Sequence, residues 1–385
     1  MLKRYLLAPG PTPVPHEVLL AMAAPIIHHR SPEFIPILAQ AKEGLKWLFQ
    51  TKQDVMILTS TGTGGMVAAV TNFLSPGDKA ICIRGGKFGE RWTEICAAYG
   101  IIPVNIDVEW GTAVDPQKVE DALKADPAIK AVYFQASETS TGVIHPTKDI
   151  AEICRKREGT ICVVDAITAA GVFDLPMDSW GLDVVVTGSQ KALMLPPGLG
   201  FVAASEKAWV LNKTSRTPRY YFNLAKERKK LAENQTNFTS AASLIVGLKA
   251  SLEMMKKEGL PGIFARHDLL ARATRAGVQG MGLGLFAKVP SPALTAVKVP
   301  EGIDGGDVTK RLRDTYGVTV AGGQDTLKGR IFRLAHMGYF DTFDVIVGLS
   351  ATEMTMRGDP GEGQRSVADE GPGLGQHLRP RNRDP

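Results

Sequence analysis

The sequence is short of cysteine, of aromatic residues and of long hydrophobic runs. Its 385 residues include only four cysteines, which lack CxxC spacing and lie in apolar stretches: Cys82, Cys96, Cys154 and Cys162. We expect buried free thiols in a reducing compartment. No apolar run approaches the ~18 residues of a membrane span, and prolines interrupt the N-terminal residues where a signal sequence would need an apolar core. We therefore expect a cytoplasmic protein that does not enter a membrane.

An excess of charge of one sign is also missing. The formal net charge is +5 over the whole chain, and aromatic residues make up 7%. With no basic stripe and few rings to stack on bases, nucleic acid is not an expected partner. A hydrophobic content of 44% and a charged content of 22% are typical of a soluble globular protein, and this length corresponds to about two or three domains.

Between residues 54 and 205, short β-branched runs alternate with amphipathic stretches. Helices are predicted at 63–74 and 87–99, and a further helix is capped by Asp115 and begins at Pro116. The predicted strands are residues 54–59, 79–83, 101–106, 131–135, 161–165, 184–187 and 200–204. Because these strands are apolar throughout, the sheet should be covered by helices on both faces. The pattern predicts an α/β fold with a large, mostly parallel sheet.

Beyond residue 205 the pattern changes to longer helical stretches with two isolated strands. Helices are predicted at 240–257, 263–281, from Asp304 and at 341–356, and strands at 294–299 and 330–335, as in a smaller α+β domain. The charged run 226–230 is interpreted as a solvated helix face. We expect an N-terminal arm over 1–15, a large domain over 16–255, a small domain over 256–357 and a disordered tail over 358–385.

Ligands of parallel sheets bind beyond the carboxyl ends of the strands, and four such ends carry polar residues. Residues 59–65 form a turn of small residues before a helix, which suits an anion but is equally consistent with a plain tight turn. It matches neither the dinucleotide fingerprint, because Val67 takes the sixth position, nor the P-loop. Asp165 ends a buried strand and could be a helix N-cap or the partner of a cation. Lys191 follows another strand in apolar surroundings, where burial would make its amine nucleophilic, although lone lysines are more often surface residues.

The fourth end, residues 135–142, is a turn rich in hydroxyl groups. An anion site, a carboxylate, a buried amine and hydroxyl donors on one sheet edge together suit pyridoxal 5′-phosphate, a phosphorylated aldehyde that forms a Schiff base with lysine.

The motifs resemble those of the class V aminotransferases of pyridoxal-phosphate fold type I, in the alanine–glyoxylate, serine–glyoxylate and serine–pyruvate branch. The similar segments are PGPTPVP at 9–15, HRSPEF at 29–34, TGTG at 61–64, ETSTG at 138–142, VDA at 164–166, GSQKAL at 188–193 and FRL at 332–334. They occur in the family's order over nearly the whole folded chain. The resemblance implies a large cofactor-binding domain, an N-terminal arm near the active site and a homodimer with shared active sites.

The resemblance also implies roles for single residues. Lys191 would form the Schiff base and move the proton between substrate carbon and cofactor, and Asp165 would keep the pyridine nitrogen protonated. The implied phosphate ligands are Thr63, Gly64, Gly65, Gln190 and, across a dimer interface, Thr239.

The remaining implied roles concern the cofactor ring and the substrate. Phe88 stands where family members often place a ring-stacking tryptophan, and Thr139 would bond near the ring's phenolic oxygen. Arg333 would bind the substrate α-carboxylate, with a structural salt bridge as the alternative, and Gly10 would line the substrate pocket.

The resemblance implies an aminotransferase that moves the amino group of alanine or serine to glyoxylate or a similar 2-oxo acid. Aspartate and ureidoglycine remain open as donors. Cysteine desulfuration is disfavoured because no cysteine follows Cys162. Outside this chemistry, a nicotinamide oxidoreductase and a non-catalytic assembly subunit remain open. His28 and His29 are adjacent, without an evident third ligand, so no metal site is predicted.

Overall fold

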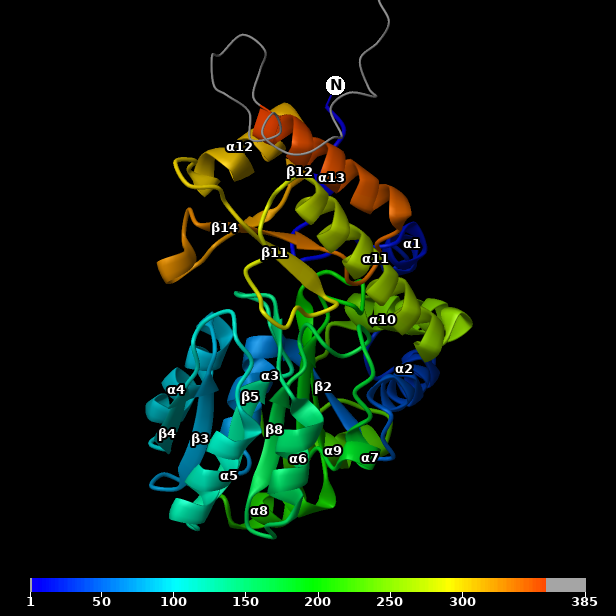
Figure 1. The fold of residues 1–385 in the computed structure, drawn as a ribbon. Helices are drawn as coiled ribbons and strands as arrows, with labels where there is room; N and C mark the ends of the chain where they lie inside the picture. Colours follow the sequence, from blue (N-terminus) through cyan, green and yellow to red (C-terminus); the bar gives the residue numbers. More distant parts are fainter. Residues whose placement is uncertain (1, 358–385) are drawn as a thin grey trace, which may run out of the picture.

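The computed structural model describes residues 2–357, so the tail predicted over 358–385 lies outside the described residues. A large part built on one sheet lies below a smaller part in Figure 1. Among the described helices, none is long and apolar enough to cross a membrane.

The large part contains a seven-stranded sheet in the order β2-β10-β9-β8-β5-β3-β4. Its strands are β2 (Val55–Ser60), β3 (Lys79–Arg84), β4 (Ile102–Asp107), β5 (Ile129–Gln135), β8 (Ile161–Asp165), β9 (Val184–Gly188) and β10 (Gly198–Ala204). Only β10 runs antiparallel to its neighbours, while the pairs from β9 to β4 are parallel. All seven predicted strands therefore occur, and the mostly parallel α/β fold is confirmed.

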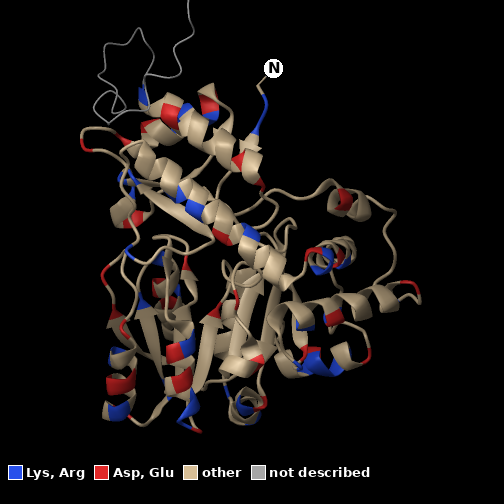
Figure 2. Ribbon diagram, turned by 45° about the vertical axis from the view of Figure 1, so that its right-hand side comes forward, with Lys and Arg blue, Asp and Glu red and all other residues tan. Residues whose placement is uncertain are grey.

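Successive strand residues point into two separate cores, one on each face of the sheet. Ile57 and Val164 belong to one core, whereas their neighbours Met56 and Val163 belong to the other. The first face is covered by α2 (Phe34–Phe49), α5 (Pro116–Ala125), α6 (Thr147–Arg155) and α10 (Ala242–Glu258). The second is covered by α3 (Gly62–Thr71), α4 (Lys87–Ala98) and α8 (Glu206–Thr214). The strands of the large sheet are largely tan in Figure 2, whereas charged residues occur on the surrounding helices and loops, as expected for a sheet buried on both faces.

Helix ends follow local signals where the sequence provides them. The side chain of Asp115 accepts a hydrogen bond from the amide of Gln117 and Pro116 opens α5, as predicted. The helix predicted over 63–74 ends three residues early, at Thr71, and the side chain of the C-cap residue Asn72 donates to the carbonyls of Ala68 and Phe222. Helix α2 was not predicted, since its N-cap residue Glu33 makes no side-chain capping hydrogen bond and Pro36 lies in its first turn.

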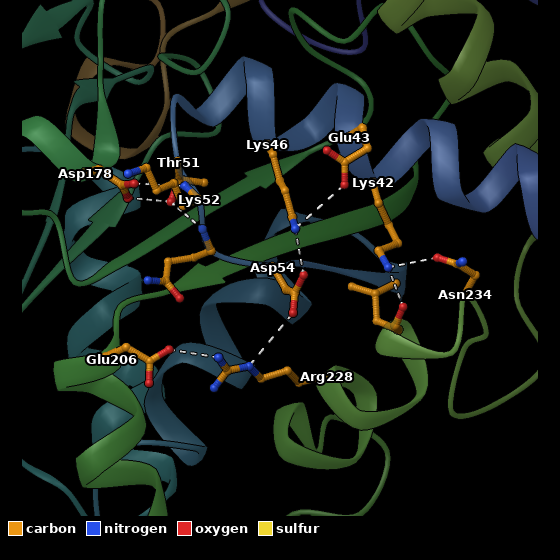
Figure 3. A network of polar contacts seen from close by, with 12 residues as sticks. Lys42, Glu43, Lys46, Thr51, Lys52, Asp54, Asp178, Glu206, Arg228 and Asn234 are labelled. Atoms are coloured by element: carbon orange, nitrogen blue, oxygen red, sulfur yellow. Dashed lines mark hydrogen bonds and ion pairs between the residues drawn. The ribbon is translucent and has the colours of Figure 1, made fainter.

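The charged run 226–230 lies in helix α9 (Leu224–Ala232). Arg228 pairs with Glu206 at 2.8 Å and lies 4.0 Å from Asp54, which also pairs with Lys46 of α2 at 3.1 Å (Figure 3). The prediction of a fully solvated face was wrong for Glu227, which is buried and accepts a hydrogen bond from the amide of Asn237. Burial raises the pKa of Glu227 to about 7.

The smaller part is built on a three-stranded antiparallel sheet in the order β11-β14-β13. Its elements are α11 (Leu260–Gly280), β11 (Leu294–Lys298), α12 (Gly305–Thr315), β12 (Val318–Thr319), β13 (Ala321–Gly322), a 3-10 turn (Asp325–Leu327), β14 (Ile331–Ala335) and α13 (Thr342–Arg357). The short strand β1 (Tyr5–Leu6) pairs in parallel with β12, so the N-terminal segment is attached to this part. The domain boundaries at residues 15, 255 and 357 stay predictions.

The remaining elements are connections of the large part. They are α1 (His16–Met22), β6 (Ser137–Glu138), β7 (Val143–Ile144) and α7 (Met177–Trp180). The β6-β7 hairpin continues from β5 at the carboxyl end of the sheet, where the polar residues of the next section lie.

Replacement of Phe201 by alanine should destabilise the large part strongly. Phe201 lies in β10 and is fully buried, so a cavity is expected to lower the free energy of unfolding by about 3–5 kcal/mol. Equilibrium urea unfolding followed by circular dichroism measures the loss. Val210→Ala is the control, because Val210 is 61% exposed and should change that free energy by less than about 0.5 kcal/mol. Equal effects of the two changes would contradict the assignment of Phe201 to the core.

Candidate active site

Two neighbouring strands bring Asp165 and Lys191 to the same edge of the sheet. Asp165 is the last residue of β8 and pairs in register with Val186 of the parallel strand β9. Lys191 follows three residues after the end of β9. The carboxyl ends of parallel strands all lie at the same edge of the sheet, and this is the edge where ligands bind in such sheets.

The amine of Lys191 is enclosed by the N-terminal segment. Its Nζ donates a hydrogen bond to the carbonyl of Pro9. A Cβ on Gly10 would lie 1.9 Å from the same Nζ, and Gly10 has a φ of +125°, so only glycine suits this position. Burial lowers the pKa of Lys191 to about 8, and the positive charge of Arg333 lowers it further, whereas Asp165 opposes the shift. The alternative of an ordinary surface lysine was therefore wrong.

Asp165 is a buried carboxylate rather than a helix cap. Its Oδ1 accepts a hydrogen bond from the amide of Ile167 at 2.8 Å, but the residues that follow form turns and no helix begins there. Burial raises the pKa of Asp165 to about 7, and the charges of Arg91 and Lys191 act in the opposite direction. A cationic partner would restore the charged form of this carboxylate.

Arg333 comes from the smaller part and lies close enough to influence Lys191. In β14 its buried guanidinium donates from Nε and Nη2 to the carbonyl of Gly322 and from Nη1 to the carbonyl of Thr139, at 3.1, 2.7 and 2.9 Å. Arginine has five N–H donors, so one remains on each terminal nitrogen. Burial lowers its pKa to about 10. The alternative of a structural salt bridge was wrong, because these three donors bind backbone carbonyls.

The turn between β2 and α3 has the form of an anion site. The first amides of a helix have no partner within the helix, and the side chain of the N-cap residue Thr61 makes no capping hydrogen bond. Thr63, Gly64 and Gly65 lie in the first turn of α3. A Cβ on Gly64 would lie 1.9 Å from Oγ of Ser60, so the glycine keeps this turn open.

Gln190 lies next to this turn. A Cβ on Gly188 would lie 3.0 Å from Oε1 of Gln190 and 3.1 Å from the amide nitrogen of Gly62, which places both groups around Gly188. Oε1 is buried and has no hydrogen-bond partner. Rotation of the amide would direct its NH₂ group to the same place, since hydrogen bonding decides this orientation.

The other predicted site residues lie around this edge with different contacts. Oγ1 of Thr139 shares a hydrogen bond with Oγ1 of Thr168 at 2.9 Å, so it is the Thr139 carbonyl that contacts Arg333. Phe88 lies in the first turn of α4. Thr239 is exposed and lines a small cavity with Thr59 at the end of β2.

Glu138, which was not among the predicted site residues, positions the turn that carries Phe88. Its carboxylate is fully buried and accepts hydrogen bonds from the amides of Gly89 and Ser140 at 2.9 and 3.0 Å and from Oγ of Ser140 at 2.6 Å. Burial raises the pKa of Glu138, and these hydrogen bonds oppose the rise. Its place in the hydroxyl-rich turn was the available signal, but the contact with α4 depends on the fold.

Comparison with known proteins now identifies the family. The family model of the class V aminotransferases matches residues 4–339. The chain belongs to this family. The aminotransferase therefore depends on pyridoxal 5′-phosphate and is a transaminase, and the alternative of a nicotinamide oxidoreductase was wrong.

Individual relatives have different names. The aminotransferase is 44% identical to the 42 kDa subunit of a soluble hydrogenase from Anabaena cylindrica, over 92% of this chain and 93% of that one. It is 37% identical to a serine–glyoxylate aminotransferase from Hyphomicrobium methylovorum, over 92% and 89%. Among solved structures, an aspartate aminotransferase from Thermus thermophilus is similar with a TM-score of 0.84 and 32% identity, covering 91% of this chain and 99% of that one.

The residues at the sheet edge fit the cofactor. The uncapped start of α3 and the unpartnered amide of Gln190 suit a phosphate group. The buried Asp165 suits a protonated ring nitrogen, and the Lys191 amine suits an aldehyde because its lowered pKa of about 8 makes the reactive neutral form accessible. Bound pyridoxal phosphate supplies a ring that accepts the negative charge developing on the substrate.

The cysteines and the adjacent histidines were also possible reactive groups. All four cysteines are buried and unpaired, and none lies in the smaller part, where desulfuration would need a mobile one. Within residues 2–357, no group of three or more His, Cys, Asp or Glu side chains could hold a metal ion. The rings of His28 and His29 are tilted by 41° with centroids 4.5 Å apart, and Arg30 donates to Gln235 at 3.1 Å.

The reactivity of Lys191 in the apoprotein should rise with pH through a midpoint near 8. Only the neutral amine attacks an aldehyde, and its pKa is about 8. Trapping of pyridoxal on Lys191 with cyanoborohydride, quantified by mass spectrometry between pH 6 and 10, gives the midpoint. Arg333→Gln should move the midpoint upward, because it removes a cation that lowers the pKa, and Asp165→Asn should move it downward. A wild-type midpoint near 10 would contradict the buried environment.

Proposed function

We propose that this aminotransferase moves the amino group of serine or alanine to glyoxylate, which yields glycine and the corresponding 2-oxo acid. The observation that carries the choice of donor is the single guanidinium beside the reactive amine. Arg333 and Asp165 are the charged groups that shift the pKa of Lys191. One guanidinium with two remaining donors matches one α-carboxylate.

The space beside Lys191 also favours a small substrate. The carbonyl of Pro9 contacts Nζ directly, and a single added carbon on Gly10 would overlap it. Backbone atoms therefore bound the region where the substrate side chain would lie. Glyoxylate, serine and alanine need little space here, and the serine–glyoxylate relative supports this pairing.

Three residues would carry the chemistry. Lys191 would accept a proton at Nζ from the substrate α-carbon and return it to the cofactor carbon, since its pKa near 8 suits both directions. Asp165 would hold the proton on the ring nitrogen. Arg333 would bind and orient the α-carboxylate through its free N–H groups.

The remaining site residues would hold the cofactor. The N-terminal turn of α3, with Thr63, Gly64 and Gly65, would bind the phosphate together with Gln190. Phe88 would stack on the ring, and Thr139 would contact its polar edge. Gly10 would leave the substrate pocket open.

A cytoplasmic homodimer with shared active sites is part of this proposal. Thr239 would reach the phosphate of the partner subunit. Exposed aromatic residues near it support an interface, because Tyr220 is 77% exposed and the ring of Tyr221 stacks on that of Phe238 with centroids 5.0 Å apart. The hydrogenase name of one relative supports a role as an assembly subunit instead, but that role would not require the buried amine, carboxylate and guanidinium at one sheet edge.

Lys191→Ala should abolish transamination and leave the fold intact. The change removes the amine that bonds the cofactor and moves the proton, so turnover with serine and glyoxylate should fall by at least about 1,000-fold, judged from the size of acid–base contributions. Glycine formation measures turnover, and circular dichroism checks the fold. Lys213→Ala, on the exposed surface of α8, should behave as wild type. Unchanged turnover in Lys191→Ala would refute the assignment of this residue.

Serine or alanine should convert the bound cofactor to its amine form more efficiently than aspartate or ureidoglycine. Absorbance spectra recorded after addition of each donor, without acceptor, measure this half-reaction. Arg333→Lys should raise the donor KM by about 10- to 100-fold, since the forked contact is lost. Arg330→Lys, at an exposed position before β14, serves as control. A preference for aspartate would overturn the donor assignment but not the reaction class.

A further inference from the structure

Arg91 contacts two of the residues expected to hold the cofactor, although it was not among the residues predicted from the sequence. It lies in α4, one turn after Phe88. Its Nη1 donates to Oγ1 of Thr63 at 3.1 Å, and its guanidinium carbon lies 4.9 Å from the centroid of the Phe88 ring. One side chain therefore links the start of α3 to the ring expected to stack on the cofactor.

The charge of Arg91 is not neutralised by a carboxylate. Across residues 2–357, Arg91 forms no ion pair with an acidic side chain, and its side-chain hydrogen bond goes to the Thr63 hydroxyl. Its positive charge nevertheless acts on this edge of the sheet, because it is one of the charges that lower the pKa of Asp165. A partly exposed guanidinium is thus directed at the site without a protein anion to balance it.

The phosphate group lacks a cationic partner among the predicted ligands. Thr63, Gly64, Gly65, Gln190 and Thr239 are all neutral. A phosphate monoester carries a charge of about −1.5 to −2 near neutral pH, and a helix N-terminus contributes only about half a positive charge. Most of the negative charge would remain without compensation.

We propose that Arg91 is a cofactor-binding residue that supplies the positive charge for the phosphate group at the start of α3. The hydroxyl of Thr63 is the shared contact between the guanidinium and this anion site. Arg91 also lies over the ring of Phe88 and restrains it. Its effect on the affinity for the cofactor comes from its interaction with the phosphate group. The inference extends the proposed binding of the cofactor at this sheet edge and rests on it.

Measuring the binding of two aldehydes to the apoprotein distinguishes a role of Arg91 toward the phosphate from a role through the ring of Phe88. Pyridoxal 5′-phosphate and pyridoxal share the ring and the aldehyde, but pyridoxal lacks the phosphate. Affinities are measured by absorbance titration for wild type, Arg91→Gln and Arg91→Lys. Arg272→Gln is the matched control, because Arg272 is an exposed helical arginine paired with Asp268 in α11. Circular dichroism and the unfolding midpoint check that each variant is folded.

Arg91→Gln should weaken the binding of pyridoxal 5′-phosphate by about 10- to 100-fold, as expected for loss of a charged hydrogen bond, and change that of pyridoxal less than twofold. Arg91→Lys should restore part of the affinity, and inorganic phosphate should compete less well for the variant Arg91→Gln than for wild type. Equal losses for both aldehydes would overturn the proposal in favour of a role through Phe88. Unchanged affinities would also overturn it. Failure of the wild-type protein to bind either aldehyde would instead refute the proposed cofactor site.

Discussion

Three influences set the pKa of the buried Lys191 amine: burial and the positive charge of Arg333 lower it to about 8, and the carboxylate of Asp165 raises it. The reactivity of the site depends on this balance between influences that raise and lower the pKa of Lys191. If the amine were fully solvated it would stay protonated and unreactive at neutral pH. If it were buried beside carboxylates alone, its charged form would be favoured. The opposed influences of Arg333 and Asp165 keep both protonation states accessible.

Segments distant in the sequence create this environment. Asp165 and Lys191 come from adjacent strands of the large sheet, Arg333 from the smaller sheet, and the carbonyl of Pro9 from the N-terminal segment. The site therefore forms where the two parts of the molecule meet, and strand β1 holds the N-terminal segment to the smaller part. Movement of one part against the other would change the distance between the amine and the guanidinium.

Helix α4 carries both Phe88, which is expected to stack on the cofactor ring, and the charged residue Arg91. The buried carboxylate of Glu138 accepts hydrogen bonds from amides in the first turn of this helix, so the backbone that carries Phe88 is fixed. One turn later the same helix presents Arg91 to Thr63. The carboxyl group of Glu138 at the N-terminus of α4 and the guanidinium of Arg91 on its surface thus both act on the region where the cofactor is expected to bind.

The sequence by itself determined the seven strands, the two-sided burial of the sheet and several helices, such as the one that Asp115 caps, because apolar runs, prolines and capping residues act locally. Strand ends were sufficient to find Asp165, Lys191 and the turn before α3, while Arg333 and Gly10 came from the resemblance to a family. Only the tertiary structure decided the roles that depend on contacts across the fold. Nothing local in the sequence shows that Glu138 lies beneath α4, that Glu227 is buried within a charged run, or that Arg91 faces Thr63. Those positions follow from helix packing on a sheet whose strand order differs from the chain order, so residues such as Thr63 and Arg91 become neighbours only after folding.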